Sequence, residues 1–439
     1  MTASRGGPAR PAPGVRVILD VRPLQAPDRA PATAAYLDAL LAAFDAAPLA
    51  GESFAFLLQS DLDDPTERFT NLDVAARRML PPTRLLRSGA LTVDPFLVGG
   101  ASIGAAWRAD RHGAAGAVYH AAGGTVPLFS RVPTVVTLLD LAPWELPGAF
   151  QRGTTVRFGQ RLRAQLLREA AAVVVGTEVV ATAARRLLRL SRDRLHVVPL
   201  AAREAFRRPT QRPSDAESEP ETPRAERPAA DHRAERDRLG LPERYLVYSG
   251  RYDARHDLTT LLRALAELAA APRPTGLSGS AAWPPRVLLV GASPDDRAAL
   301  ARAAAREGAG DALAYAPALE PARLASLVAG ARAALLPVLS EAAGFAAIEA
   351  VAAGTPVIAS AVGALPELVG AAGILVEPRD VGRLAVAIAT AWADDRVHDR
   401  LAKAARTKAN ADPRTWADVA WDMRAIYAGA AIQREKRSA

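Results

Sequence analysis

Residues 333–360 read AALLPVLSEAAGFAAIEAVAAGTPVIAS. An apolar strand at 333–336 is followed by a loop and by a short apolar helix at 345–353. Gly354 ends this helix and Pro356 precedes a second strand at 357–359, which is the usual order of a C-terminal glycine and then a proline. A strand, a helix and a second strand in this order predict one β-α-β unit of a parallel sheet.

Similar units are predicted on both sides of this stretch, because short β-branched runs alternate with longer segments of helical period. The predicted fold class is therefore α/β, with parallel sheets covered by helices on both faces. The predicted strands are 15–20, 54–58, 118–120, 134–139, 173–176 and 195–199 in the first half and 245–249, 287–290, 333–336, 357–359 and 374–376 in the second. Residues 33–44 and 179–190 are examples of the predicted helices.

The chain has 439 residues, which predicts two domains because single cores stop growing at about 250 residues. The segment PTQRPSDAESEPETPRAERPAADHRAERDR has almost no large apolar residue and cannot offset its ordering entropy. The predicted organisation is a disordered tail at 1–14, an N-terminal Rossmann-like domain at 15–205, a linker or disordered insertion at 206–240, a C-terminal Rossmann-like domain at 241–410 and a C-terminal helix at 411–430 that packs back across the domains.

Composition excludes several classes of function. There is no cysteine, so disulfides, thiol catalysis and cysteine-ligated metals are excluded. No window reaches about 18 uninterrupted apolar residues and the opening segment lacks an apolar core, so we expect a cytoplasmic protein. The formal charge of +8 suits an anionic partner, but no nucleic-acid module or interleaved aromatic pattern accompanies it. Neither GxGxxG after a first strand nor a P-loop motif is present.

Chemistry is expected at the carboxyl ends of the C-terminal strands, where open parallel sheets bind ligands. Gly250 and Arg251 follow the strand YLVYS, and Glu341 lies in the loop that follows ALLP. The N-terminus of the helix that starts at Phe345 would offer free N–H groups to a diphosphate, and Arg251 could neutralise a leaving diphosphate. Glu349, one turn into that helix, can accept two hydrogen bonds from a vicinal diol such as a ribose.

The segment EAAGFAAIEAVAAGTPVIAS resembles the signature of the retaining nucleotide-sugar glycosyltransferases of group 1, often called family 4, in which two glutamates are separated by seven residues. The resemblance continues through GALPELVGAAGILVEPRD, YLVYSGRYDARHDLTTLLRAL, YHAAGGTVPLFSRVPTVVTLLDL and VVVGTEVVATAARRLLRL, over roughly residues 15–427. It implies the GT-B fold, in which two Rossmann-like domains face each other across a cleft. The donor nucleotide would bind the C-terminal half and the acceptor mainly the N-terminal half.

The resemblance also implies a set of site residues. The predicted catalytic residues are Glu341 and Arg251; the predicted donor-binding residues are Gly250, Arg251, Arg255, His256, Gly344, Phe345 and Glu349. The leaving phosphate would take the acceptor proton, and no metal or cofactor would be needed. On the acceptor side we expect His120 and Asp140, with the alternatives that His120 is a hydrogen-bonded core residue and that Asp140 caps the following turn.

Four departures from the family pattern lie at the expected site. Ala32 and Ala34 replace the glycines of the N-terminal loop, and Leu139 replaces a histidine. His256, with Arg255 beside it, stands where the family has a lysine, and the first glycine of EGFG is missing. These departures support a second hypothesis, a catalytically impaired scaffold or regulatory subunit that pairs with an active partner.

The partners expected from the sequence are a nucleotide sugar, a glycan or lipid-linked acceptor, and a protein partner or second copy of the chain. Nucleic acid is not among them. Four arginines of the N-terminal half lie near apolar residues and predict a peripheral contact with the inner membrane face: Arg77, Arg78, Arg84 and Arg87.

Overall fold

The predicted strands form two parallel sheets in the computed structural model. The structure describes residues 14–82, 94–101, 116–123, 125–207, 227–250, 252–275, 277, 281–411 and 413–438, with the backbone alone at 227–231 and 433–438. The chain divides into two compact units: unit 1 contains residues 1–143, 151–199 and 416–439, and unit 2 contains residues 144–150 and 200–415. Each unit is an α/β domain, so the predicted fold class is confirmed.

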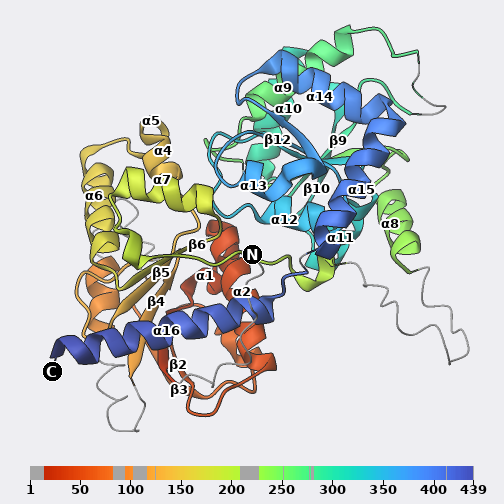
Figure 1. Ribbon diagram of the computed structural model, residues 1–439. Coiled ribbons are helices and arrows are strands. Elements are labelled where there is room, and N and C mark those ends of the chain that lie inside the picture. The colour runs from red at the N-terminus through yellow and green to blue at the C-terminus, as the bar shows by residue number, and fades with distance from the viewer. Residues whose placement is uncertain are drawn as a thin grey trace, which may run out of the picture. The chain divides into compact units, whose positions relative to one another are not determined.

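The sheet of unit 1 has seven strands in the order β3-β2-β1-β4-β5-β6-β7 (Figure 1). Its strands are β1 (Arg16–Asp20), β2 (Ser53–Gln59), β3 (Val74–Leu80), β4 (Ala117–Ala122), β5 (Thr134–Thr137), β6 (Ala172–Val175) and β7 (Leu195–Val197). Its longer helices are α2 (Pro31–Ala46), α6 (Thr154–Glu169), α7 (Glu178–Leu188) and α16 (Trp416–Ser438). The short helices α1 (Arg22–Gln25) and α4 (Ala142–Glu145) each follow a strand.

The last helix, α16, is part of the core of unit 1. It packs on α2 and on strands β4 and β5, and it buries Val419, Met423 and Tyr427. Arg424 of α16 forms a two-pronged ion pair with the buried Glu52, at 2.9 and 2.7 Å. The sequence predicts a helix at 411–430, whereas the structure has α15 ending at Ala411 and α16 starting at Trp416.

The sheet of unit 2 has six strands in the order β10-β9-β8-β11-β12-β13. They are β8 (Leu246–Ser249), β9 (Val287–Val290), β10 (Leu313–Ala316), β11 (Ala333–Leu336), β12 (Val357–Ser360) and β13 (Gly373–Val376). The helices are α5 (Pro147–Phe150), α8 (Arg227–Arg238), α9 (Leu258–Ala270), α10 (Pro294–Glu307), α11 (Pro321–Gly330), α12 (Phe345–Ala352), α13 (Leu365–Val369), α14 (Val381–Ala393) and α15 (Asp395–Ala411).

Alternate residues of these strands pack into two separate cores. Val247 of β8 faces the core formed with α11 and α12, whereas Leu246 and Tyr248 face the core formed with α9 and α14. The strands are apolar on both faces, as expected of a parallel sheet covered by helices on both sides. This arrangement places the loops that follow β8 and β11 together at the carboxyl edge of the sheet.

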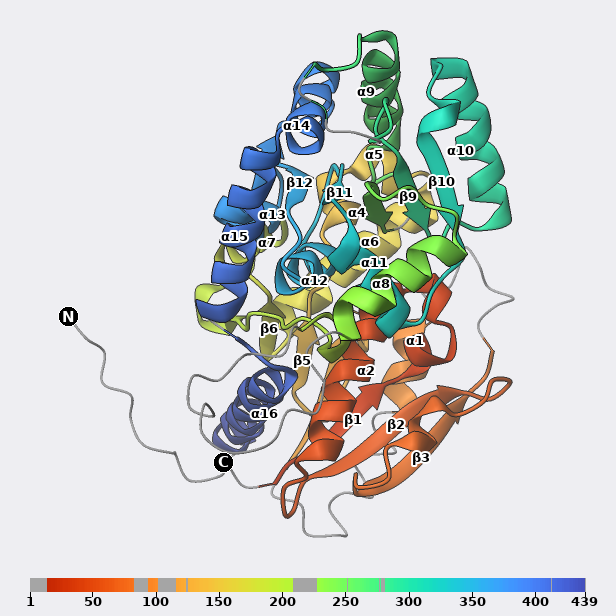
Figure 2. The ribbon, with the colours of Figure 1, turned by 90° about the vertical axis from the view of Figure 1, so that its right-hand side faces the viewer.

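Among the elements that the structure describes, two strands and one helix lie where the sequence predicts none. The edge strands β3 and β10 were missed; Figure 2 shows β3 beyond β2 at the margin of its sheet. In β3 exposed residues alternate with partly buried ones, so it has no continuous apolar run. Helix α8 lies inside the predicted linker 206–240. Its Glu235 is 5% exposed and forms ion pairs with Arg238 of the same helix and with Arg323 of α11. The pair with Arg323 attaches α8 to α11 although α8 has no large apolar face.

Candidate donor site at the carboxyl edge of the unit 2 sheet

The loop between β11 and α12 is closed by Glu341. One carboxylate oxygen of Glu341 accepts a hydrogen bond from the backbone N–H of Gly344 at 2.8 Å. Gly344 has a φ of 68°, and a Cβ there would lie 2.1 Å from the Cδ1 of Leu368. Glycine is favoured at this position, because the backbone is left-handed and a Cβ would displace the side chain of Leu368. Helix α12 starts at the next residue, Phe345.

The segment after β12 braces the same loop. A Cβ at Gly363 would lie 1.9 Å from the carbonyl oxygen of Glu341, and the N–H of Ala364 donates to that oxygen at 2.9 Å. The buried Ser340 donates through its hydroxyl to the carboxylate of Glu145 at 2.5 Å. The position of the Glu341 carboxylate is therefore set by contacts on both sides of the loop.

Glu349 lies one turn into α12 and is 6% exposed. Its carboxylate is paired with Arg203: the Nε donates to one oxygen at 2.5 Å and the Nη2 to the other at 3.0 Å. Burial raises the pKa of Glu349, and the hydrogen bonds and charge of Arg203 only partly offset that effect. A cavity of about 20 Å³ adjoins Glu349 and is bordered by Phe206 and Ser249.

The loop after β8 is hydrogen-bonded to the loop after β11. The N–H of Leu339 donates to the carbonyl of Arg255 at 2.6 Å, and His256 forms a bridge with Val338. The structure thus brings Arg255 and His256 next to the segment that carries Glu341. Gly250 is exposed at the end of β8. Arg251, the predicted diphosphate ligand, lies outside the described residues.

Asp253 organises the basic side chains of this loop. Its carboxylate accepts from the Nε of Arg255 at 3.1 Å and contacts the Nδ1 of His256 at 3.2 Å. Burial raises the pKa of Asp253, but the hydrogen bond with His256 and the charge of Arg255 outweigh burial and lower it to about 2. The His256 ring also packs edge-on against Tyr248, with ring centroids 6.0 Å apart. Asp253 was not predicted; the acid two residues before Arg255 is the signal that could have identified it.

The two predicted acceptor-side residues have structural contacts in unit 1. His120 has no exposed area, and its ring nitrogens are 2.8 Å from the hydroxyls of Thr137 and Tyr427. This corrects the acceptor-side interpretation of His120, because a residue sealed in the core cannot contact an acceptor. Asp140 is half-buried and accepts from the N–H of Ala142 at 2.8 Å, so it caps the following turn.

The N-terminal departures from the family pattern also lie in packed positions. Ala32 and Ala34 are in the first turn of α2, and Ala34 is buried. Leu139 is 6% exposed, and a Cβ at Gly123 would lie 3.4 Å from it and 2.6 Å from the hydroxyl of Thr33. The apolar side chain of Leu139 packs beside Gly123 and cannot form a hydrogen bond there.

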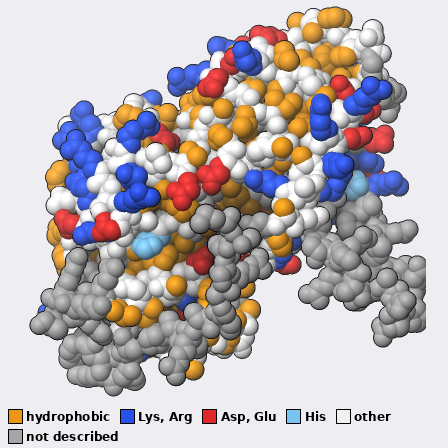
Figure 3. Space-filling view, in the orientation of Figure 1, with side chains coloured by type: hydrophobic (Ala, Val, Ile, Leu, Met, Phe, Trp, Pro, Cys, Tyr) orange, Lys and Arg blue, Asp and Glu red, His pale blue; other side chains and the backbone are white. Residues whose placement is uncertain are grey.

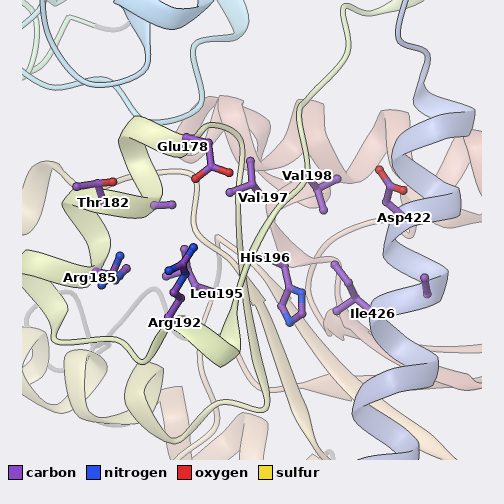
Figure 4. A pocket seen from close by; sticks show the side chains of 12 residues that line it. Glu178, Thr182, Arg185, Arg192, Leu195, His196, Val197, Val198, Asp422 and Ile426 are labelled. Carbon is purple, nitrogen blue, oxygen red and sulfur yellow. The ribbon is translucent and has the colours of Figure 1, made fainter. Parts of the chain in front are cut away.

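Unit 1 has a further groove, of about 670 Å³, between α7, β7 and α16 (Figure 4). Arg185 and Arg192 lie on one side of it and Asp422 and Ile426 on the other. The predicted site residues that the structure describes do not line this groove. Within the part of the chain that the structure describes, no cluster of three or more His, Asp or Glu side chains could hold a metal ion.

The chain is similar in sequence and in fold to known glycosyltransferases. Residues 231–408 match the family described as "Glycosyl transferases group 1". The comparison with curated protein sequences gives no significant match. The fold resembles sucrose-phosphate synthase from Thermosynechococcus elongatus (TM-score 0.67, 21% identity), with 94% of this chain and 98% of that chain covered.

Two further solved structures cover both units. WaaG, a glycosyltransferase involved in lipopolysaccharide biosynthesis, has a TM-score of 0.64 and 17% identity over 94% of this chain and 99% of its own. HepE from Anabaena, solved in complex with UDP-glucose, has a TM-score of 0.63 and 17% identity over 96% of this chain and 99% of its own. The chain therefore has the GT-B fold, and its residues 231–408 match the family model of the group 1 glycosyltransferases.

Proposed function

We propose that the protein transfers a glycosyl group from a nucleoside diphosphate sugar to a glycan or lipid-linked acceptor with retention of configuration. The observation that carries the proposal is the placement of Glu349. It is a buried carboxylate one turn into α12, with the family spacing from Glu341 and at the carboxyl edge of β11. Such a carboxylate can accept hydrogen bonds from both hydroxyls of a ribose.

The same edge supplies positive charge for the donor diphosphate. Helix α12 points its N-terminus towards the loop that carries Glu341, and the partial positive charge of a helix N-terminus stabilises phosphate oxygens. Arg255, which lies over the Phe150 ring at 5.5 Å, and His256 stand in the neighbouring loop. We assign Arg251 to the diphosphate from its place in the sequence.

In the proposed reaction the bond from the anomeric carbon to the diphosphate oxygen breaks and the acceptor oxygen bonds to the same face of the sugar. The leaving phosphate accepts the acceptor proton, and Arg251 with the α12 dipole stabilises the negative charge that develops. Glu341 contacts the donor sugar. No metal is required in this scheme, since basic side chains and the helix N-terminus supply the charge.

The alternative of a catalytically impaired subunit has one specific observation in its favour. Leu139 is buried where the family places a hydrogen-bonding histidine near the reacting centre. In that case nucleotide binding persists, turnover is lost, and the protein acts through a partner or a second copy of itself.

Thermal-shift titration with UDP-, GDP- and ADP-sugars tests the proposal. A donor-dependent rise in Tm that both Arg251→Ala and Glu349→Ala abolish would support it, with Arg302→Ala and Glu267→Ala as controls at exposed positions of α10 and α9. Release of the nucleoside diphosphate from the donor then distinguishes an enzyme from a binding subunit. Lack of any shift at millimolar donor would contradict the proposal.

A peripheral membrane contact is a separate part of the proposal. No described helix is long and apolar enough to cross a bilayer. Of the predicted contact residues, Arg77 is exposed and pairs with Asp64, while Arg84 and Arg87 lie outside the described residues. Lys and Arg side chains also gather over α6 and α7 of unit 1 (Figure 3). Arg157 and Arg161 are exposed residues of α6. Flotation with vesicles that does not depend on anionic lipid would count against this contact.

A further inference from the structure

The backbone of Arg203 is fixed within unit 2. Arg203 precedes the short turn Glu204–Phe206, and its carbonyl accepts from the N–H of Phe206 at 2.9 Å. Its neighbours Ala202 and Phe206 are 5% and 2% exposed in the same core that contains residues of α11 and α12. The guanidinium lies 5.1 Å from the centroid of the Phe206 ring. Arg203 is therefore held at the level of α12 by its own segment.

The pairing of Arg203 with Glu349 is two-pronged, since the Nε and Nη2 each donate to a different carboxylate oxygen. This geometry fixes the plane of the carboxylate as well as its position. An ionised carboxylate has about four lone-pair sites, and Arg203 uses two of them. One site remains on each oxygen, so a vicinal diol can donate to the carboxylate while Arg203 stays in place.

Arg203 also opposes protonation of Glu349. Burial raises the pKa of this carboxyl, and Arg203 supplies the interactions that lower it. Without Arg203 the carboxyl would be neutral up to a higher pH, and a neutral carboxyl would offer one oxygen as a donor instead of two acceptors.

We propose that Arg203 is a positioning residue for the donor ribose: it orients the Glu349 carboxylate so that both oxygens accept hydrogen bonds from the 2′- and 3′-hydroxyls. This inference rests on the proposed function, because that function assigns the ribose to Glu349. Arg203 contacts the carboxylate and does not need to touch the substrate.

Calorimetric titration with UDP, GDP and ADP and their 2′-deoxy forms tests the inference at pH 7 and pH 9. We expect the wild-type protein to bind its ribonucleotide about tenfold or more tightly than the deoxy form, as one hydrogen bond to a charged group is lost. Glu349→Gln should reduce this ratio at both pH values. Arg203→Met should reduce it, and more strongly at pH 7 than at pH 9, because the lower pH favours the neutral carboxyl of Glu349.

Two further variants complete the design. Arg203→Lys keeps the positive charge but loses the two-pronged hydrogen bonding of the guanidinium, so it should give an intermediate ratio of ribonucleotide to deoxynucleotide affinity at both pH values. It also replaces Arg203→Met in the test if that variant does not fold. Arg207→Met is the matched control, because Arg207 lies in the same segment and pairs with the exposed Glu204. Its ratio should equal that of the wild type.

The outcomes separate the inference from the proposed function. If Glu349→Gln lowers the ratio but both Arg203 variants leave it unchanged, the positioning role is refuted while the ribose assignment stands. If the wild-type protein binds the ribo and deoxy forms equally, the ribose assignment to Glu349 fails and the inference fails with it. If none of the three nucleotides binds, the proposed function itself is contradicted.

Discussion

The buried His120 should make unit 1 sensitive to mild acid. Its imidazole is enclosed between Thr137 and Tyr427, and burial lowers its pKa from 6.5 to about 3. The unfolded chain therefore binds a proton below pH 6.5 that the folded chain does not bind until about pH 3. Stability from His120 is fully present above pH 6.5 and is lost as the pH falls, at about 1.4 kcal/mol per pH unit.

From these values, the change from pH 7.5 to pH 5 should remove about 2 kcal/mol from the free energy of unfolding of unit 1. His120→Gln cannot titrate, so it isolates this contribution from that of the carboxylates. We would measure both proteins by urea unfolding with pulsed hydrogen exchange, which follows β4 and α16 separately from unit 2. The variant should be less stable at pH 7.5, but the difference should shrink by about 2 kcal/mol at pH 5. An equal loss in both proteins would refute the reasoning.

Three other predictions follow from the packing and charges. Gly344→Ala should destabilise unit 2 by about 2 kcal/mol or more in a thermal melt, because it adds a Cβ against Leu368 at a left-handed φ. Gly382→Ala is the control: its added Cβ meets nothing within 4 Å, so the variant should be neutral or slightly stabilised. Arg424→Met should cost unit 1 about 3 kcal/mol by leaving the buried Glu52 unpaired, and adding Glu52→Gln should recover part of this loss in urea unfolding. EDTA should leave the donor affinity unchanged in calorimetric titration; a loss of affinity that Mg²⁺ restores would contradict the proposed metal-free site.

The sequence predicts the central strands well because burial on both faces selects continuous apolar runs. Strands β9 and β11 have the predicted bounds, and β8 differs by one residue. Edge strands leave a weaker signal: β3 reads VAARRML, without a continuous apolar run, because exposed residues alternate with partly buried ones along it. Helix α8 is joined to α11 by the ion pair of Glu235 with Arg323, which lies 88 positions away, and no local pattern in the sequence records such a pair.

The candidate site was predictable where it depends on short spacings and not where it depends on distant partners. Glu341, Gly344 and Glu349 lie within one loop and helix, and the structure keeps them there. The pairing of Glu349 with Arg203 joins residues 146 positions apart, which no local pattern records. The alternatives for His120 were open because the sequence shows a strand end but not the hydroxyls that enclose its ring.

The division of unit 1 between both ends of the chain has a consequence for synthesis on the ribosome. Nearly all of unit 2 is one continuous segment, residues 200–415, and the ribosome completes this segment before it starts α16. Unit 1 starts to emerge first, but its core is incomplete until Tyr427 and the rest of α16 pack on α2, β4 and β5. During that interval a nascent parallel sheet exposes apolar surface, which favours aggregation. We therefore expect the N-terminal half to depend on chaperones until the last helix is released.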